Sequence, residues 1–295
     1  MKKILILGAT GMAGHMIYYY LLSLNKYEIY TVCFRNKITE DSIVLDVYNT
    51  DGIKIVLRQF DPDYIINCVG VLVNGAKRSP ENAIYINAYF PHLLVRLINE
   101  QNPSSRLIHI STDCVFSGSK GSYVDNDIKD ALDIYGMTKN LGEIVDDKNL
   151  TLRTSIIGPE LKENGEGLMH WIFSQRDKNE INGYEKSIWG GITTLELAKA
   201  IYQCIEHNVT GLYQLSNGEK ISKYALIQLI VSQFKLNIPV RKVDGIVTDK
   251  SIIPSIRDDF CFAVPSYANM IEELCHWMFM RQDLYLNYIV PSPMK

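Results

Sequence analysis

The feature that most constrains the fold of this chain is a regular alternation of short apolar runs and longer helical segments through its first half. KKILIL and PDYIIN are apolar runs of the kind that buried strands form, whereas HMIYYYLLSL and TDGIKIVLRQF have the length and periodicity of helices. The same alternation continues with the strand patterns YEIYTVCF, SIVLDV and SRLIHIST and the helix pattern NAYFPHLLVRLINEQ. Strands that alternate with helices pair in parallel through right-handed crossovers. We therefore predict an α/β fold built on a doubly wound parallel sheet.

The alternation fades near Gly158, and we predict a change of lobe there. Residues 1–158 would form the sheet domain, and residues 188–217, with the patterns TTLELAKAIYQCIE and GLYQLSN, would return to it. Residues 159–187 and 218–295 would form a smaller C-terminal lobe. With 295 residues, the chain is long enough for one large domain or for two unequal lobes.

The charge balance favours a small-molecule partner. The chain has 30 basic and 33 acidic residues, without a long run of either sign. Basic arms that bind nucleic acid and basic patches that bind membrane surfaces both need such runs. We expect neither partner.

The cysteine pattern and the hydropathy indicate a reduced, cytoplasmic protein. Six cysteines lie far apart, without C-x-x-C or the Cys/His spacing of a zinc site, so we expect free thiols and no metal. The apolar run after the first lysines ends at Gly8, too early for a signal peptide. No uninterrupted apolar stretch reaches the roughly 18 residues that a membrane span needs, so we expect no membrane insertion.

The stretch GATGMAG resembles a dinucleotide-binding turn. Gly8, Gly11 and Gly14 follow the first predicted strand and open its helix, the context that such a turn needs. The first glycine makes a tight turn, the second lets the backbone approach a pyrophosphate, and the third lets the helix pack on the sheet. Amides near Met12, at the helix N-terminus, would face the phosphates, and Thr10 lies within the same turn. An ordinary structural turn is the alternative.

The end of the second strand favours NADPH over NADH. An NAD site usually has an acidic residue about 20 positions beyond the glycines, but Arg35 lies there. Its guanidinium suits a 2′-phosphate. The alternative is that Arg35 is a solvated loop charge and that Asp41 reaches the cofactor site instead. Asp46, with Val47 at the end of the third strand, could contact the adenine, and a turn-forming role for Asp46 is the alternative.

Tyr135 and Lys139, in IYGMTKNLGE, are four residues apart and share one face of a predicted helix. A nearby ammonium favours the phenolate of a tyrosine, so the pair can exchange a proton with a carbonyl oxygen. Thr112, in HISTDCVF, ends a strand and is expected to converge with them at the carboxyl edge of the sheet. An exposed helix with a solvated lysine is the alternative.

Together these motifs resemble the extended short-chain dehydrogenases/reductases, and more narrowly the dTDP-4-dehydrorhamnose reductase family. The resemblance rests on ILILGATGMAG, IINCVG, INAYFPHLLV, HISTDCVFSG, YGMTKNLGE, LRTSIIGP and TTLELAKAI, over roughly the first 200 residues. It implies a Rossmann domain that binds NADPH and a C-terminal lobe that binds a nucleotide sugar. By resemblance, Tyr135 donates a proton, Lys139 holds the nicotinamide ribose, and Thr112 binds the sugar carbonyl. By resemblance, Val69 and Gly70 lie where the fourth strand of the family runs beside the cofactor.

Other residues are candidates for contacts with the substrate. By resemblance, Asn87 supports the site from its helix, and Asp113 lies beside Thr112. Lys250 and Arg257 are candidates for a diphosphate, with solvated loop charges as the alternative. The pair His170 and Trp171 could line the nucleotide pocket or belong to the core; of the two, Trp171 is the candidate substrate contact.

Two departures from the family leave the sugar open. The family commonly has tyrosine where this chain has Cys114, and an Asp-Gln-containing stretch where it has KSIWGGITT. A 2-acetamido sugar on UDP would therefore fit as well as a 6-deoxy sugar on dTDP.

The resemblance implies reduction of the 4-keto group of a nucleotide-linked 4-keto-6-deoxy sugar, in the synthesis of cell-surface polysaccharide precursors, by a protein that could form a homodimer. One alternative is an epimerase or 4,6-dehydratase that retains its NAD. Such relatives tend to be longer and to be acidic where Arg35 lies. The other alternative is a regulator that senses NADP without catalysis and need not keep Thr112, Tyr135 and Lys139.

Overall fold

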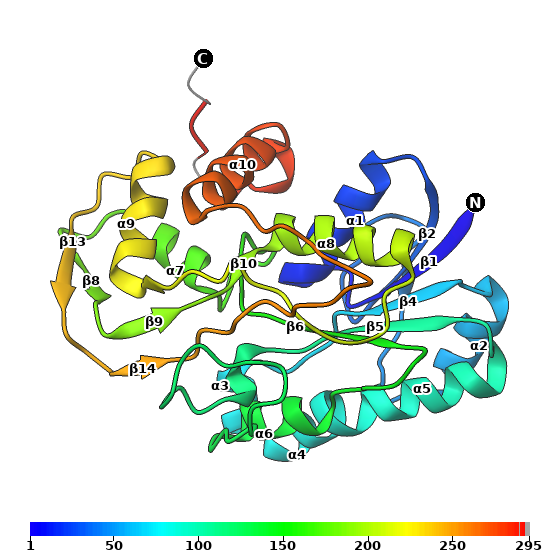
Figure 1. Ribbon diagram of the computed structural model, residues 1–295. Helices are drawn as coiled ribbons and strands as arrows, with labels where there is room; N and C mark the ends of the chain where they lie inside the picture. The colour runs from blue at the N-terminus through cyan, green and yellow to red at the C-terminus, as the bar shows by residue number, and fades with distance from the viewer. Residues whose placement is uncertain (289, 293–295) are drawn as a thin grey trace.

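A seven-stranded parallel sheet forms the centre of the computed structural model, which describes residues 1–288 and 290–292 (Figure 1). Every neighbouring pair of its strands is parallel. This arrangement confirms the doubly wound α/β prediction. In spatial order the strands are β11 (Gly211–Gln214), β6 (Leu150–Arg153), β5 (Arg106–Ile110), β4 (Tyr64–Asn67), β1 (Lys2–Leu7), β2 (Tyr27–Cys33) and β3 (Ile43–Val44).

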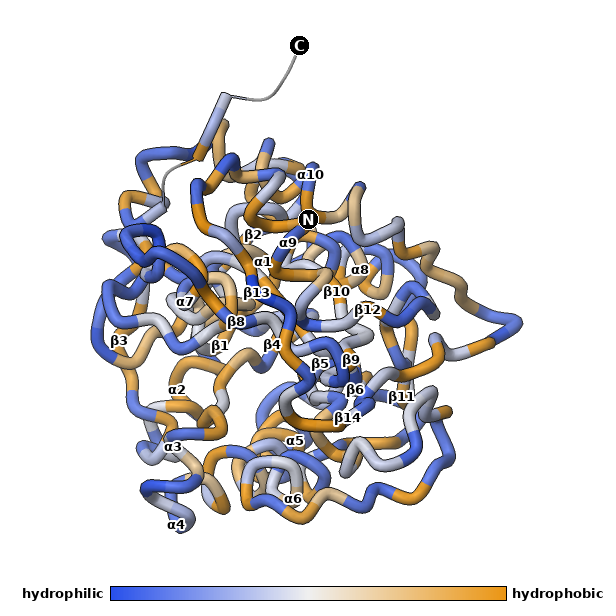
Figure 2. The backbone as a smooth tube through the Cα atoms, turned by 90° about the vertical axis from the view of Figure 1, so that its left-hand side faces the viewer, coloured by the Kyte–Doolittle hydropathy of each residue, from blue (hydrophilic) through white to orange (hydrophobic). Residues whose placement is uncertain are grey.

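Helices cover both faces of the sheet because its strands are apolar on both sides. Ile4 and Ile6 of β1 face the cluster of α1 (Met12–Ser23) and α8 (Thr194–His207), while Leu5 and Leu7 face the cluster of α2 (Thr50–Phe60) and α5 (Phe90–Gln101). Successive side chains of a strand point to opposite faces, so one apolar run serves two helical layers. Figure 1 shows α1 and α8 on one side of the sheet and α2 and α5 on the other, and Figure 2 shows hydrophobic stretches along α2 and α5.

Two predicted elements differ in extent from the structure. The third strand is only Ile43–Val44, because Asp46 accepts a hydrogen bond from the amide of Tyr48 in a turn that ends it. The helix predicted from NAYFPHLL begins earlier, as α4 (Pro80–Ala83) and a π-helical segment (Ile84–Tyr89) that runs directly into α5. Proline has no amide hydrogen, so Pro91 cannot bond the carbonyl of residue 87 in an α-helical ladder.

The chain beyond residue 155 adds short elements around the edge of the sheet, and α8 and β11 return to the sheet itself. Within the described residues, no helix is both long and apolar enough to cross a membrane. The division into lobes near Gly158 stays a prediction. The added elements are β7 (Ile156–Ile157), α7 (Leu168–Ser174), β8 (Ile181–Tyr184), β9 (Ser187–Trp189), β10 (Ile192–Thr193), β12 (Ile221–Ser222), α9 (Lys223–Gln233), β13 (Val240–Val243), β14 (Thr248–Asp249) and α10 (Tyr267–Phe279).

Candidate active site

The glycine turn between β1 and α1 has the shape that a bound phosphate requires. Gly8 has a φ of +78°, which favours glycine, and its carbonyl accepts a hydrogen bond of 3.0 Å from the amide of Gly11. A Cβ at Gly14 would lie 2.2 Å from the Gly8 oxygen, so only glycine fits there. The first turn of α1 has no side-chain cap among the described residues, which leaves amides at its start for an anion. Thr10 lies half-buried in the same turn.

A cavity of about 370 Å³ opens next to this turn, at the carboxyl edge of the sheet. Parallel strands present their ligand crevice at this edge. The predicted site residues that line it are Gly11, Met12, Val69, Gly70, Thr112, Asp113, Tyr135 and Lys139. The cavity therefore brings together the three predicted catalytic side chains and half of the predicted cofactor-binding residues.

Tyr135 lies on the first turn of α6 (Ile134–Leu141), which Asp133 caps by accepting a hydrogen bond of 2.9 Å from the amide of Gly136. A Cβ at Gly136 would lie 2.2 Å from the carbonyl oxygen of Cys114, so this glycine lets α6 pack closely on the residues after β5. Burial raises the pKa of Tyr135, and the nearby thiol of Cys114 raises it further, while a hydrogen bond with the Thr112 hydroxyl lowers it. The phenol is thus protonated at neutral pH and lies beside Thr112.

The ammonium of Lys139 is buried and donates a hydrogen bond of 2.7 Å to the carbonyl oxygen of Ile110, the last residue of β5. Burial lowers the pKa of Lys139 to about 8, although Glu143 and Cys68 act in the opposite direction. The sequence predicted that Lys139 favours the phenolate of Tyr135. In the structure the ammonium binds a main-chain carbonyl instead, and burial of Tyr135 dominates, so the phenol keeps its proton.

The residues after β5 line another side of the cavity. Thr112 accepts a hydrogen bond of 3.1 Å from the amide of Cys114, and its own hydroxyl donates to Asp113 over 3.1 Å. Burial raises the pKa of Asp113, while Lys250, from the far C-terminal segment, lowers it. Burial also raises the pKa of Cys114 to about 12. The Asp113 carboxyl group therefore lies near the predicted proton donor Tyr135, and Lys250, which does not line the cavity, acts electrostatically on Asp113 and Cys114.

The predicted adenosine contacts lie outside this cavity. Arg35 is exposed, and its guanidinium lies 4.8 Å from the centre of the Phe34 ring, just beyond β2. Asp46 holds the turn after β3, as its alternative interpretation predicted, and Val47 is buried beside it. Because β2 and β3 are parallel to β1, these residues share the carboxyl edge with the glycine turn.

Asn87 and Trp171, two further candidates for substrate contacts, differ in where they lie. Asn87 is buried in the π-helical segment, where its side chain exchanges hydrogen bonds of 2.8 and 2.9 Å with the main chain of Val71 and thereby supports the cavity wall. Trp171 on α7 is 39% exposed and does not line the cavity, and neighbouring His170 is 3.2 Å from the Tyr288 hydroxyl.

Arg257 is not brought to the cavity. Its guanidinium pairs with Asp259 and donates to the carbonyl oxygen of Thr210, which precedes β11. That end of β11 is the amino edge of the sheet, opposite the ligand crevice. Arg257 therefore lies on the side of the sheet away from the cavity and does not contact a ligand there.

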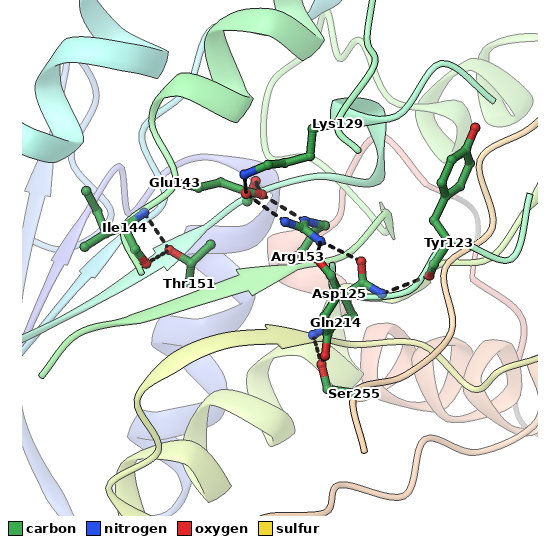
Figure 3. Close-up of polar contacts among 10 residues, drawn as sticks. Tyr123, Asp125, Lys129, Glu143, Ile144, Thr151, Arg153, Gln214 and Ser255 are labelled. Carbon is green, nitrogen blue, oxygen red and sulfur yellow. Dashed lines mark hydrogen bonds and ion pairs between the residues drawn. The ribbon is translucent and has the colours of Figure 1, made fainter. Parts of the chain in front are cut away.

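Behind the cavity lies a buried ion pair that the sequence did not indicate. Arg153 at the end of β6 donates two hydrogen bonds of 2.9 and 2.8 Å to the carboxylate of Glu143, and both side chains are 1% exposed (Figure 3). Glu143 also accepts hydrogen bonds from Ser111, next to Thr112, and from Lys129. Burial raises the pKa of Glu143, but Arg153 and these donors outweigh it and lower the pKa. The pair thus joins the end of α6 to the end of β6, and the Ser111 hydroxyl links it to the residues after β5.

Sequence reasoning also missed one wall of the cavity. Glu160, Lys162, Glu166 and Gly167 line it, from the segment where the strand and helix patterns fade. The Glu160 carboxylate accepts a hydrogen bond of 2.6 Å from the amide of Gly167, which closes this segment into a loop. No local pattern could have indicated it. Elsewhere, all six cysteines are free, and the described His, Cys, Asp and Glu side chains form no group of three that could hold a metal.

Comparison with known proteins agrees with this geometry. The RmlD substrate binding domain family matches residues 1–261. The chain belongs to this family. It is 29% identical over 266 residues to the dTDP-4-dehydrorhamnose reductase of Aggregatibacter actinomycetemcomitans, which covers 84% of this chain and 85% of that relative. The resemblance predicted from the sequence is thereby confirmed.

Two further similarities are informative. The solved structure of Bacillus anthracis dTDP-4-dehydrorhamnose reductase in complex with NADP has a TM-score of 0.81 and 22% identity, covering 95% of this chain and 99% of that one. Methionine adenosyltransferase 2 subunit beta of Rattus norvegicus is 23% identical over 271 residues, covering 87% of this chain and 78% of that relative. The chain is thus similar both to a protein named as a reductase and to one named as an enzyme subunit.

Proposed function

We propose that this protein reduces the 4-keto group of a nucleotide-linked 4-keto-6-deoxy sugar with NADPH. The observation that carries the proposal is the convergence of Thr112, Tyr135 and Lys139 on one cavity beside a glycine turn. A phenol that keeps its proton at neutral pH, next to a second hydroxyl, is suited to protonating a carbonyl oxygen. The reductases named above give this chemistry a substrate class.

The glycine turn fits a dinucleotide. Gly14 lets the start of α1 pack directly against Gly8. A Cβ at Gly70 would contact only the Asn87 amide oxygen, at 3.6 Å, so the wall at Gly70 leaves space for a ligand. Arg35 would bind the 2′-phosphate, and Lys139 the nicotinamide ribose. When bound, NADPH supplies the hydride that turns the keto carbon into an alcohol carbon.

The residues of the chain supply the proton and the orientation. Thr112 donates a hydrogen bond to the keto oxygen and orients it toward Tyr135. As the new C–H bond forms, the Tyr135 hydroxyl gives its proton to that oxygen, and the resulting phenolate later takes a proton from water. The Lys139 ammonium stabilises the phenolate electrostatically once its charge appears. Since these groups handle both proton and charge, we propose a chemical step without a metal, which activity after chelation would test.

One basic residue outside the cavity lining is a candidate for binding an anionic ligand. Lys250 lowers the pKa of both Asp113 and Cys114 from outside the cavity lining, and we propose that it binds the diphosphate. Cys114 leaves open whether the sugar carries a 2-acetamido group, as on a UDP sugar. We also propose the smaller lobe as the nucleotide-binding part, and a role in polysaccharide precursor synthesis. The homodimer and the cytoplasmic location stay predictions.

A second function is favoured by one observation, the similarity to methionine adenosyltransferase 2 subunit beta. In this alternative, the chain would bind NADP at its glycine turn and act as a subunit of another enzyme without reducing a sugar. An epimerase or dehydratase that retains NAD is less favoured, because Arg35 stands where an acidic residue would bind the ribose of NAD.

The deciding experiment is NADPH oxidation with a panel of 4-keto-6-deoxy sugars linked to dTDP and UDP, with the product configuration determined by NMR. The proposal expects turnover with at least one member. NADPH binding without turnover on any member would favour the regulatory alternative.

A further inference from the structure

The segment after α10 is linked by hydrogen bonds to two walls of the cavity, directly to one and through His15 to the other. We call residues 282–288 the C-terminal strap. It lies beside α1, on the same side of the sheet (Figure 1). Its two tyrosines, Tyr285 and Tyr288, are buried, and their rings pack edge to face with their centres 6.4 Å apart. Nothing in the reaction described above uses either phenol.

Tyr285 contacts the glycine turn through one intervening side chain. Its hydroxyl lies 3.3 Å from Nε2 of His15, and Nδ1 of His15 lies 2.8 Å from the carbonyl oxygen of Gly11. A carbonyl only accepts, so Nδ1 carries the hydrogen and Nε2 accepts from the phenol. His15 is fully buried, and burial lowers its pKa to about 4, so the ring is neutral at physiological pH. Gly11 itself lines the cavity.

Tyr288 contacts the loop of Glu160 and Gly167, which forms a second wall of the cavity and packs against Met12 at the start of α1. Its hydroxyl accepts a hydrogen bond of 2.8 Å from the amide of Glu160 and lies 3.2 Å from Nδ1 of His170. Glu160 in turn holds the amide of Gly167, and both residues line the cavity. A buried N–H group without a hydrogen-bond partner destabilises a fold. The Tyr288 oxygen, as the acceptor for the Glu160 amide, therefore restricts where this loop can lie.

We propose that the strap positions both ligand-binding walls: Tyr285, through His15, positions the glycine turn for the dinucleotide, and Tyr288 positions the loop around Glu160 for the second ligand. Both tyrosines are positioning residues, because neither touches the cavity itself. The inference rests on the proposed function only for the identity of the two ligands. It predicts that two oxygen atoms three residues apart in sequence affect different ligands.

The experiment compares Tyr285→Phe and Tyr288→Phe with the wild type. NADPH binding is measured by fluorescence titration, and binding of dTDP and of UDP by calorimetry. Loss of one hydrogen bond corresponds to an about fivefold change in Kd. Tyr285→Phe should therefore raise the Kd of NADPH about fivefold and leave the nucleotide Kd within about twofold, whereas Tyr288→Phe should do the reverse.

Two further variants separate positioning from stability. His15→Asn keeps an amide that can donate to Gly11 but loses the acceptor for Tyr285, so it should match Tyr285→Phe, and the double variant should be no worse than either. Tyr27→Phe is the matched control, since it removes a buried hydroxyl that bonds Glu206 far from the cavity. It should lower Tm without changing either Kd.

Equal effects of both strap variants on both ligands would overturn the proposal, as would a lower Tm with both Kd values unchanged. If neither nucleotide binds the wild type, the substrate class proposed above is wrong. The NADPH measurements on Tyr285→Phe and His15→Asn then decide the inference by themselves.

Discussion

The ammonium of Lys139 donates a 2.7 Å hydrogen bond to the main-chain carbonyl of Ile110, where β5 ends and the loop bearing Thr112 begins. Helix α6 and strand β5 are thereby joined through the residue that we propose to hold the nicotinamide ribose. A buried ammonium of this kind loses its proton more readily than a solvated one.

The activity is expected to fall as pH rises through about 8. Burial lowers the pKa of Lys139 to about 8, whereas burial raises that of Tyr135, so the lysine is the first of the two to lose its proton. Above that pH, Lys139 is neutral and no longer stabilises the phenolate. The measurement is kcat/KM for the keto sugar between pH 6 and 10. Lys139→Met should lack the basic limb, with weaker NADPH binding and lower turnover throughout. A wild-type profile that stays flat to pH 10 contradicts this role.

NADPH is expected to bind at least about tenfold more tightly than NADH, because a charge-assisted contact to the 2′-phosphate is worth about 1.5–3 kcal/mol. Arg35→Ala should abolish the preference by weakening NADPH binding while sparing NADH. Lys37→Ala is the control, since this neighbouring lysine instead donates to the carbonyl of Glu40. Dissociation constants from fluorescence titration provide the test. Equal affinity of the wild type for both cofactors would show that Arg35 does not bind the phosphate.

Breaking the buried pair of Arg153 and Glu143 should destabilise the fold by about 3–5 kcal/mol, because Arg153→Met leaves a buried carboxylate short of its main partner. Glu143→Gln in the same chain should recover much of that loss by removing the charge. The control is Arg96→Met, whose pair with Glu100 is solvent-exposed and worth under about 1 kcal/mol. Urea denaturation gives the free energy of unfolding of the wild type, of the two single variants Arg153→Met and Arg96→Met, and of the double variant. Equal costs for Arg153→Met and Arg96→Met would contradict the prediction.

The cavity thiols should resist alkylation at pH 8. Burial raises the pKa of Cys68 and of Cys114 to about 12, so only about one molecule in ten thousand carries either thiolate at that pH. Cys261 is exposed and should react first with iodoacetamide. Peptide mass spectrometry over time gives the order. Faster labelling of Cys114 than of Cys261 would mean that the cavity is more polar than its burial indicates.

Much of the site could be predicted from the sequence because its signals are local. The spacing of Gly8, Gly11 and Gly14 reflects one turn and one helix start, and the spacing of Tyr135 and Lys139 reflects one helical face. The parallel, doubly wound sheet follows from the alternation of apolar runs and helices.

The remaining features depend on contacts between distant segments. Arg153 and Glu143 are a basic and an acidic residue among many, and only the packing of β6 against the end of α6 identifies them as a pair. Tyr285 and His15 are 270 positions apart. The Lys139 contact was missed for another reason: four-residue spacing indicates a shared helical face, but it does not say which acceptor the long side chain reaches.

The most direct test of the proposed reduction is the rate of NADPH oxidation by wild type and Tyr135→Phe, with the best keto sugar of the panel. Loss of the general acid should lower kcat by about 10²–10⁴, while the Kd of NADPH stays within about twofold, because the glycine turn and Arg35 are unchanged. Tyr30→Phe, which removes an exposed hydroxyl bonded to Glu28 on β2, should keep full activity. Full reductase activity in Tyr135→Phe would contradict the assignment of Tyr135 as the proton donor.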